Sequence, residues 1–204
     1  RLGAGHWRLR DDTINAMTTG RQAALAALAS IAAFAPQAAN ATIVEFQTVM
    51  GNFEVNLYDN ATPETVTNFL EYVNNGDYTS SVIHRSVAGF IVQGGGFTYD
   101  MALPLGTVPA RPAVVNEPVY SNVRGSIAMA RTNDVNSATA QFFINVELNA
   151  GLDHTGTGSS SEWGYAVFGR VIEGMDVVDD IRFVETDPRD WPLETVLIES
   201  VEVH

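Results

Sequence analysis

The sequence predicts a mainly β protein, a closed antiparallel barrel capped by two α-helices. Three observations support this fold class. Short runs of β-branched and aromatic residues recur along the chain, two segments have helical periodicity, and long loops rich in Gly, Pro and Ser separate them. The hydrophobic content of 46% and the charged content of 17% are typical of a globular protein with a full core.

The first part of the chain differs in composition from the rest. We interpret residues 1–16 as a non-native upstream extension, with Met17 as the true start. Residues 17–41 then form a signal peptide, and residues 42–204 form the mature domain.

Three features support the signal peptide. Arg21 supplies a short positive region, residues 23–35 are uncharged and dominated by Ala and Leu, and residues 39–41 offer an A-x-A cleavage site after Pro36. The apolar run is shorter than the roughly 20 residues of a transmembrane helix. The alternatives are an uncleaved anchor, which would make a membrane-tethered scaffold, and a disordered Ala-rich tail.

The mature domain is acidic and contains neither Lys nor Cys. It keeps 7 of the 11 arginines and 22 of the 24 acidic residues, a net charge of −15. Nucleic acids and anionic membranes bind clustered Lys and Arg, so neither is an expected partner. The absence of Cys excludes disulfides, thiol catalysis and cysteine metal sites. We expect a periplasmic or secreted monomer with no stable membrane insertion after cleavage.

The domain begins with a hairpin and a helix. Apolar and polar residues alternate over 42–60 around a turn at residues 50–52. In the helix that follows, Thr62 suits the N-cap, Pro63 the first helical position, and residues 75–76 the C-cap. One face of the helix carries the apolar residues Val66, Phe69, Leu70 and Val73.

The remaining elements follow the same patterns. Residues 81–96 predict two short strands around the turn at Ala88-Gly89, and residues 97–121 predict a proline-containing loop. The later elements are strands at 125–130, 141–146, 165–171 and 196–203, with a Gly/Ser loop at 155–161 and a helix at 174–183.

Polar residues interrupt the apolar stretch SVIHRSVAGFIVQGGG, residues 81–96. A guanidinium in a core strand costs several kcal/mol unless it is paired or faces a cleft. Strand alternation places Arg85 opposite His84, so Arg85 and Gln93 can face outward while His84 faces the interior. Arg85 is thus either a structural ion-pair partner or a functional group, and we interpret His84 as a satisfied core histidine. Glycines 94–96 allow a bend at the strand end.

Other kinds of site are not indicated. The three histidines of the mature domain are scattered, with no carboxylate pair at ligand spacing, so no metal or cofactor is expected. No serine lies in a nucleophile-elbow context, and the glycines at 94–96 lack the pattern of a phosphate-binding loop.

Five motifs in order carry a resemblance to a known family. They are HRSVAGFIVQGG (84–95), SIAMA (126–130), QFFINV (141–146), LDH (152–154) and YAVFGRVIEGMDVV (165–178). With them the chain resembles cyclophilin-type peptidyl-prolyl isomerases, most closely the bacterial periplasmic branch.

The resemblance implies a closed eight-stranded barrel with a helix at each end and a substrate groove on the outside of its wall. It implies Arg85 as the catalytic residue, no cofactor, and proline-containing segments of exported proteins as partners. The substrate-binding residues implied by the matched motifs are Phe90, Ile91, Gln93, Ala130, Gln141, Phe143, Leu152 and Tyr165. A peptide-binding module or chaperone with little turnover is the alternative function.

Three positions depart from the best-known eukaryotic pattern. Tyr165 replaces a pocket histidine, as in bacterial members. Gly151 stands where an aromatic residue, often Trp, is usual, which predicts weak cyclosporin binding unless Trp163 folds back to the same place. Arg131 replaces an asparagine and either favours acidic substrate segments or is an ordinary surface arginine.

Overall fold

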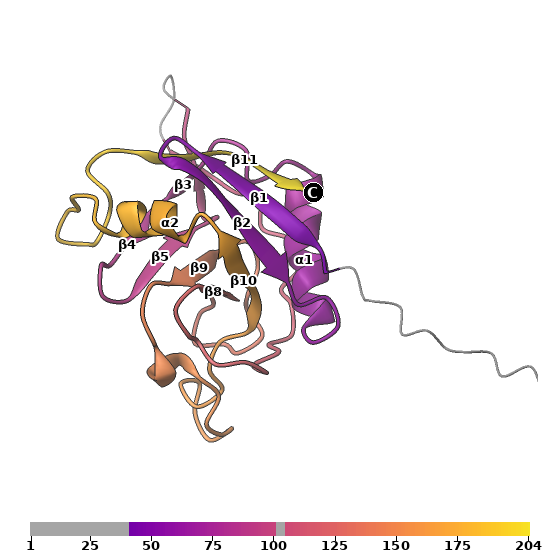
Figure 1. Cartoon of the computed structure of the whole chain (residues 1–204). Helices are drawn as coiled ribbons and strands as arrows, with labels where there is room; N and C mark the ends of the chain where they lie inside the picture. Colours follow the sequence, from indigo (N-terminus) through magenta and orange to yellow (C-terminus); the bar gives the residue numbers. More distant parts are fainter. Residues whose placement is uncertain (1–40, 101–104) are drawn as a thin grey trace, which may run out of the picture. The chain divides into compact units, whose positions relative to one another are not determined.

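The computed structural model describes residues 41–100 and 105–204. The predicted upstream extension and all of the predicted signal peptide except residue 41 lie outside this range. The described residues form one curled antiparallel sheet and two α-helices, in agreement with the predicted mainly β class (Figure 1). None of the helices in this part of the chain has the length and hydropathy needed to cross a membrane.

The sheet has eleven strands in the order β4-β5-β9-β8-β10-β2-β1-β11-β3-β6-β7. The strands are β1 (Ile43–Thr48), β2 (Gly51–Leu57), β3 (Ser81–Ile83), β4 (Arg85–Ser86), β5 (Ile91–Gly94), β6 (Phe97–Thr98), β7 (Gly106–Thr107), β8 (Ser126–Met129), β9 (Phe142–Asn145), β10 (Val167–Glu173) and β11 (Val196–Val203). A short 3-10 helix, η1, spans Ala150–Leu152.

The prediction of a closed eight-stranded barrel was wrong. The sheet is an open half-barrel of eleven strands, whose terminal strands are β4 and β7. The predicted single strand before the Ala88-Gly89 turn breaks at His84, because its pairing partner changes there. β3 pairs with β11, whereas β4 pairs with β5. The link at His84 therefore connects two strands that stand far apart in the sheet order. Two further short strands, β6 and β7, occur where the sequence predicted only a loop.

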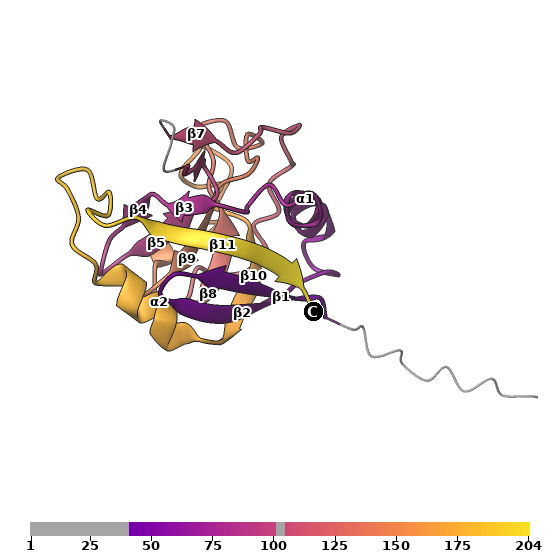
Figure 2. The same cartoon turned by 90° about the horizontal axis from the view of Figure 1, so that it is seen from above.

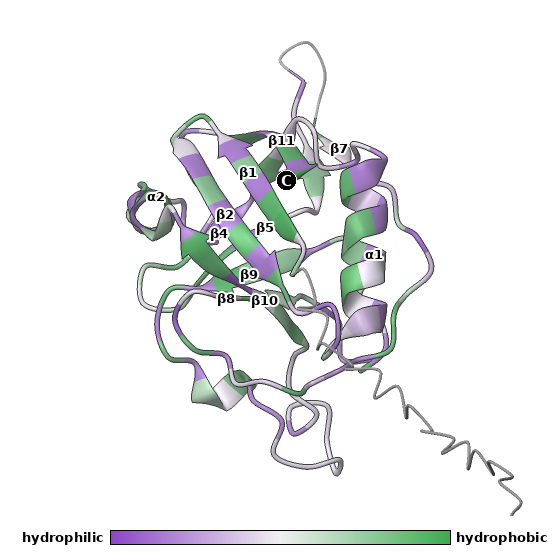
Figure 3. Ribbon diagram, turned by 45° about the vertical axis from the view of Figure 1, so that its right-hand side comes forward, coloured by the Kyte–Doolittle hydropathy of each residue, from purple (hydrophilic) through white to green (hydrophobic). Residues whose placement is uncertain are grey.

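The hairpin of β1 and β2 forms as predicted, with Thr48 paired to Gly51 across the turn. Its side chains alternate, and Figure 3 shows the resulting bands of apolar and polar residues along both strands. Phe46 and Phe53 point to the interior and stack with ring centroids 4.6 Å apart. They belong to the main hydrophobic core.

Two helices flank the sheet, α1 (Pro63–Asn74) and α2 (Met175–Arg182), on opposite sides in the view of Figure 2. α1 contacts β11, and α2 contacts β2 and β5. Thr62 occupies the N-cap of α1 as predicted, but its side chain makes no capping bond. The carboxylate of Glu117 does so instead, accepting a 2.8 Å hydrogen bond from the backbone N–H of Thr65.

A buried amide network holds the loops beside β9. The Asn145 side chain donates to Asn122 Oδ1 (3.1 Å) and accepts from Asn149 Nδ2 (2.7 Å). Asn149 Nδ2 also donates to the carbonyl of Phe90, and Asn122 Nδ2 donates to the carbonyl of Leu152. The network thereby fixes the backbone of two residues that the sequence assigns to the substrate groove.

We predict that Asn145→Ala lowers the free energy of unfolding by about 2–3 kcal/mol. The substitution leaves the buried amides of Asn122 and Asn149 short of a partner, and each unsatisfied buried group costs about 1–3 kcal/mol. Urea denaturation measures the loss. The control is Asn133→Ala, an exposed position, which should change stability by less than about 0.5 kcal/mol. Equal effects of the two substitutions would contradict the structural role of the network.

Candidate active site

A row of five cross-strand neighbours crosses the sheet on the face opposite the main core. Arg85 on β4 pairs with Gln93 on β5, and Gln93 pairs with Phe143 on β9. Phe143 pairs with Ala128 on β8, which pairs with Val167 on β10. Directly paired residues share one face of a sheet. The row, called the rung below, therefore runs from a cationic end to an apolar end.

The rung opens onto a cavity of about 210 Å³. Its lining contains every predicted site residue except Gln141: Arg85, Phe90, Ile91, Gln93, Ala130, Phe143, Leu152 and Tyr165, together with Arg131. Gln141 lines an adjoining cavity of about 200 Å³, which shares Gln93, Ala130 and Arg131 with the first. Gln93 Nε2 donates to Gln141 Oε1 at 2.9 Å, so a hydrogen bond links a residue of the first cavity to a residue of the second.

The floor of the cavity is a small apolar cluster, separate from the main core. Ile91 and Phe143 are buried in it, and Phe90 and Leu152 are partly buried against it. Tyr165 meets Phe143 edge to face, with ring centroids 5.6 Å apart. These side chains form an apolar floor that suits a small nonpolar ring.

Arg85, the cationic residue at one end of the rung, is bound by an acidic residue through a single atom, Nε. Arg85 Nε lies 3.2 Å from Asp190 Oδ2, and Arg85 Cζ lies 5.9 Å from the centroid of the Phe90 ring. In the described part of the chain, the terminal Nη groups make no hydrogen bond and remain available as donors to a ligand. Arg85 thus has an acidic partner and also lines the cavity. Both side chains of the pair are about 40% exposed, and pairs this exposed contribute little to stability.

Asp190 was not predicted from the sequence. It lies 105 residues after Arg85, in the connection between α2 and β11, and no local pattern marks it. Gln93, the cross-strand neighbour of Arg85, donates its side-chain hydrogen bond to Gln141.

His84 is buried, as predicted, between the rings of Phe97 and Trp191 at 5.0 and 5.7 Å. Burial lowers the pKa of its imidazole, so the neutral form prevails at pH 7. The prediction of a fully satisfied histidine was wrong in one respect. Nδ1 has no hydrogen-bond partner among the described residues.

Gly151 precedes Leu152, which lines the cavity. It lies in η1, and a Cβ built on it meets no atom within 4 Å. Trp163 does not line the cavity, and its ring packs near His154, with centroids 5.7 Å apart. The aromatic residue expected at this place is therefore not supplied by Trp163.

Arg131 is hydrogen-bonded to the loop that precedes Tyr165. Its Nε and Nη2 donate to the carbonyl of Gly164 at 3.1 and 2.7 Å, and Nη2 also donates to the carbonyl of Ser160. Its Cζ lies 4.6 Å from the centroid of the Tyr165 ring. Arg131 therefore ties the loop before Tyr165 to the end of β8.

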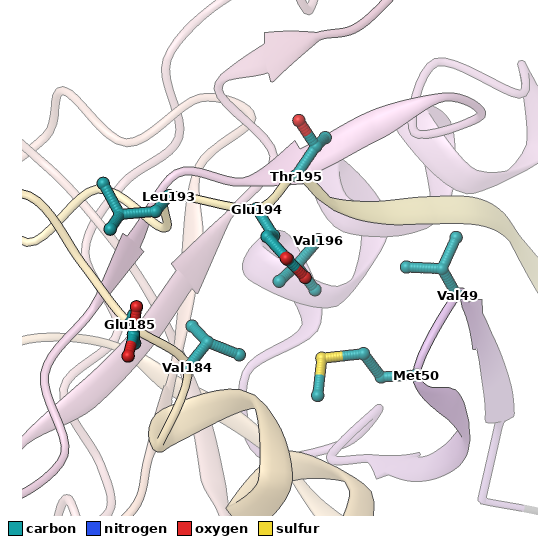
Figure 4. A pocket seen from close by; sticks show the side chains of 8 residues that line it. All are labelled: Val49, Met50, Val184, Glu185, Leu193, Glu194, Thr195 and Val196. Carbon is teal, nitrogen blue, oxygen red and sulfur yellow. The ribbon is translucent and has the colours of Figure 1, made fainter.

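A larger cavity, of about 610 Å³, lies elsewhere, between the β1–β2 turn and the connection from α2 to β11 (Figure 4). It is lined by Val49, Met50, Val184, Glu185, Leu193, Glu194, Thr195 and Val196. Two of its three polar side chains are carboxylates, which accept rather than donate hydrogen bonds at neutral pH. The smaller cavity beside Arg85 is the better candidate for a site that needs a cationic donor.

Comparison with known proteins agrees with this arrangement. Residues 43–203 match the family described as cyclophilin type peptidyl-prolyl cis-trans isomerase/CLD. Peptidyl-prolyl cis-trans isomerase cyp18 of Streptomyces antibioticus is 46% identical over 78% of this chain and 97% of its own length. Peptidyl-prolyl cis-trans isomerase B of Escherichia coli is 44% identical over 79% of this chain and 99% of its own.

Solved structures show the same fold. A Cryptosporidium parvum cyclophilin, crystallised in the presence of the dipeptide Ala-Pro, aligns with a TM-score of 0.65 at 23% identity, over 79% of this chain and 98% of that one. Since the family match covers nearly all of the described residues, and the bacterial relatives are matched over almost their whole length, the chain belongs to the cyclophilin-type peptidyl-prolyl cis-trans isomerases and has their enzymatic activity.

Proposed function

We propose that this enzyme accelerates X-Pro isomerisation during the folding of exported proteins, with Arg85 as its catalytic residue. The observation that carries the proposal is the position of Arg85 at a cavity with an apolar floor, with its terminal Nη groups free of hydrogen-bond partners among the described residues.

The chemistry requires no bond to break. Amide resonance sets the X-Pro barrier at about 18–20 kcal/mol, and uncatalysed isomerisation takes tens to hundreds of seconds. At the twisted transition state this resonance is lost, and a lone pair develops on the prolyl nitrogen. A hydrogen-bond donor directed at that nitrogen stabilises the twisted state more than either planar state, and this difference is what lowers the barrier.

Arg85 suits the donor role, because its guanidinium stays charged and carries several N–H groups. Shortening the process from about 100 s to about 10 ms is a factor of about 10⁴, or about 5.5 kcal/mol. One charge-assisted hydrogen bond supplies up to about 3 kcal/mol. The remainder must come from holding the substrate in a conformation close to the transition state.

We assign that anchoring to the rest of the cavity. Phe90, Ile91, Phe143 and Leu152 would hold the proline ring. Gln93 would donate to the carbonyl that precedes the proline, because its bond to Gln141 uses only one of its two amide hydrogens. Ala130, Gln141 and Tyr165 would form the walls along which the flanking residues lie.

The proposal extends to partners and location. Proline-containing segments of exported proteins would be the substrates, and the Cryptosporidium parvum relative crystallised with Ala-Pro is a precedent within the fold. Residues 17–41 would direct the chain to the periplasm or the exterior, where residues 42–204 would act as a monomeric domain.

A peptide-binding module with little turnover is the second candidate. The feature that favours it is the open space beside Gly151, because a less enclosed cavity holds the twisted state less tightly. The variant described next separates the two functions.

We predict that Arg85→Ala lowers kcat/KM for an Ala-Pro peptide by about 10²-fold or more, since it removes the donor to the prolyl nitrogen. A protease-coupled assay of residues 42–204 at low temperature measures the loss. Arg170→Ala, which removes an exposed arginine from β10, should leave the rate unchanged.

Either of two results would contradict the assignment. Wild-type turnover no faster than the uncatalysed rate would favour the binding module. Fast turnover in both the wild type and Arg85→Ala would show that another group is catalytic.

We predict that Gly151→Trp binds cyclosporin more tightly than the wild type, whose binding is weak. A Cβ at Gly151 meets no atom within 4 Å, so the start of a larger side chain is accommodated and an indole there would extend the apolar rim. Calorimetric titration of both proteins measures the difference. An unchanged dissociation constant would count against Gly151 as the rim position.

We predict that the exported protein begins at Thr42, because residues 39–41 form the cleavage site. Mass spectrometry of the periplasmic or secreted protein, expressed from Met17, gives the N-terminus directly. A product that retains residues 23–35 would favour the membrane-tethered scaffold instead.

A further inference from the structure

A tight turn in the connection between α2 and β11 contacts the segment that carries Arg85. Residues 187–191 form this turn, called the clamp turn below. Trp191 packs on the ring of His84, Asp190 Oδ2 lies 3.2 Å from Arg85 Nε, and the backbone carbonyl of Asp190 accepts from the N–H of Ser86 at 2.9 Å. One turn thus contacts three successive residues, His84, Arg85 and Ser86.

The clamp turn is itself well ordered by hydrogen bonds. The backbone N–H of Asp187 donates to the carbonyl of Trp191 (2.8 Å), and Asp187 Oδ1 accepts from the backbone N–H groups of Arg189 (2.7 Å) and Trp191 (3.0 Å). The bond from Trp191 is the main reason that the pKa of Asp187 is lowered. The Asp187 carboxylate therefore stays ionised and fixes the turn at neutral pH.

Asp190 has a left-handed backbone conformation, with φ at +65°. Non-glycine residues adopt this region infrequently, although Asp and Asn tolerate it better than most. Its N–H donates to the carbonyl of Asp187 at 3.0 Å, which holds the conformation in place. The backbone is thus bent at the residue whose carboxylate meets Arg85.

We propose that Asp190 is a positioning residue for Arg85. This inference rests on the proposed catalytic role of Arg85. By accepting a hydrogen bond from Nε, Asp190 fixes the plane of the guanidinium and leaves both Nη groups free to reach the substrate. A free arginine side chain has many rotamers, so fixing one of them in advance favours the transition state.

Asp190 also partly neutralises the charge of Arg85, which would make Arg85 a weaker donor. This effect is smaller than the effect of Asp190 on the orientation of the guanidinium. Both side chains of the pair are about 40% exposed, so water and salt screen their charges. A pair so exposed contributes little to folding, which leaves orientation as its main consequence.

Two substitutions at position 190 test the proposal. Asp190→Gly removes the acceptor but accepts a positive φ without strain, so the clamp turn should survive. Asp190→Asn keeps an oxygen acceptor for Nε and also tolerates the left-handed conformation. We expect kcat/KM to fall about tenfold in Asp190→Gly and to stay within about twofold of the wild type in Asp190→Asn. The affinity for an Ala-Pro peptide should stay unchanged in both.

Two controls isolate the mechanism. Glu185→Gln removes one negative charge from the same connection at an exposed position, and it should not change kcat/KM. Asp190→Gly combined with Arg85→Ala should be no slower than Arg85→Ala alone, because a positioning residue acts only through the residue that it positions.

The proposal is overturned if Asp190→Gly keeps wild-type kcat/KM, if Asp190→Asn is impaired as much as Asp190→Gly, or if Asp190→Gly slows the Arg85→Ala protein further. Failure of the proposed function has a different signature. In that case Arg85→Ala alone leaves the rate unchanged, whatever the substitutions at position 190 do.

Discussion

The register between adjacent strands is the constraint on which the site depends. Successive residues of a strand face opposite sides of the sheet, so a slip of one residue would exchange the two faces. On β9, Phe142 and Ile144 lie in the main core, while Phe143 lies in the site. Fully burying a large apolar side chain is worth about 1.5–3 kcal/mol, and several strands share the same alternation. Residues of the main core therefore set the positions of the residues that line the cavity.

Local patterns were sufficient to predict the parts of the fold that depend on local interactions. Alternation along residues 42–60 predicted the hairpin, helical periodicity predicted α1, and the same alternation placed Arg85 and Gln93 together on one face. The closure of the sheet was not predicted correctly, and the group that bonds the first backbone N–H groups of α1 was not predicted, although its N-cap residue, Thr62, was. The first depends on a change of partner at His84, and the second on a carboxylate from Glu117, so neither is encoded in neighbouring residues.

The residues of the site also divide into those that could be predicted from the sequence and those that depend on distant contacts. Sequence spacing alone could not gather Phe90, Phe143 and Leu152, and only the matched family motifs brought them into one prediction. Two contacts have no counterpart in those motifs. They are the pair between Arg85 and Asp190, across 105 residues, and the bonds from Arg131 to Gly164. Each joins a loop to a strand end, where chain geometry rather than periodicity determines the neighbour.

The pair with Asp190 also explains why an arginine is suited to the end of the rung. Lysine has a single nitrogen, so a carboxylate that orients it also competes with the substrate for the same group. The guanidinium separates the two tasks, because Nε can bind the carboxylate while two Nη groups stay available. The proposed role needs a donor that is both oriented and free, and Arg85, with its Nε on Asp190, meets both needs better than any other cationic side chain would.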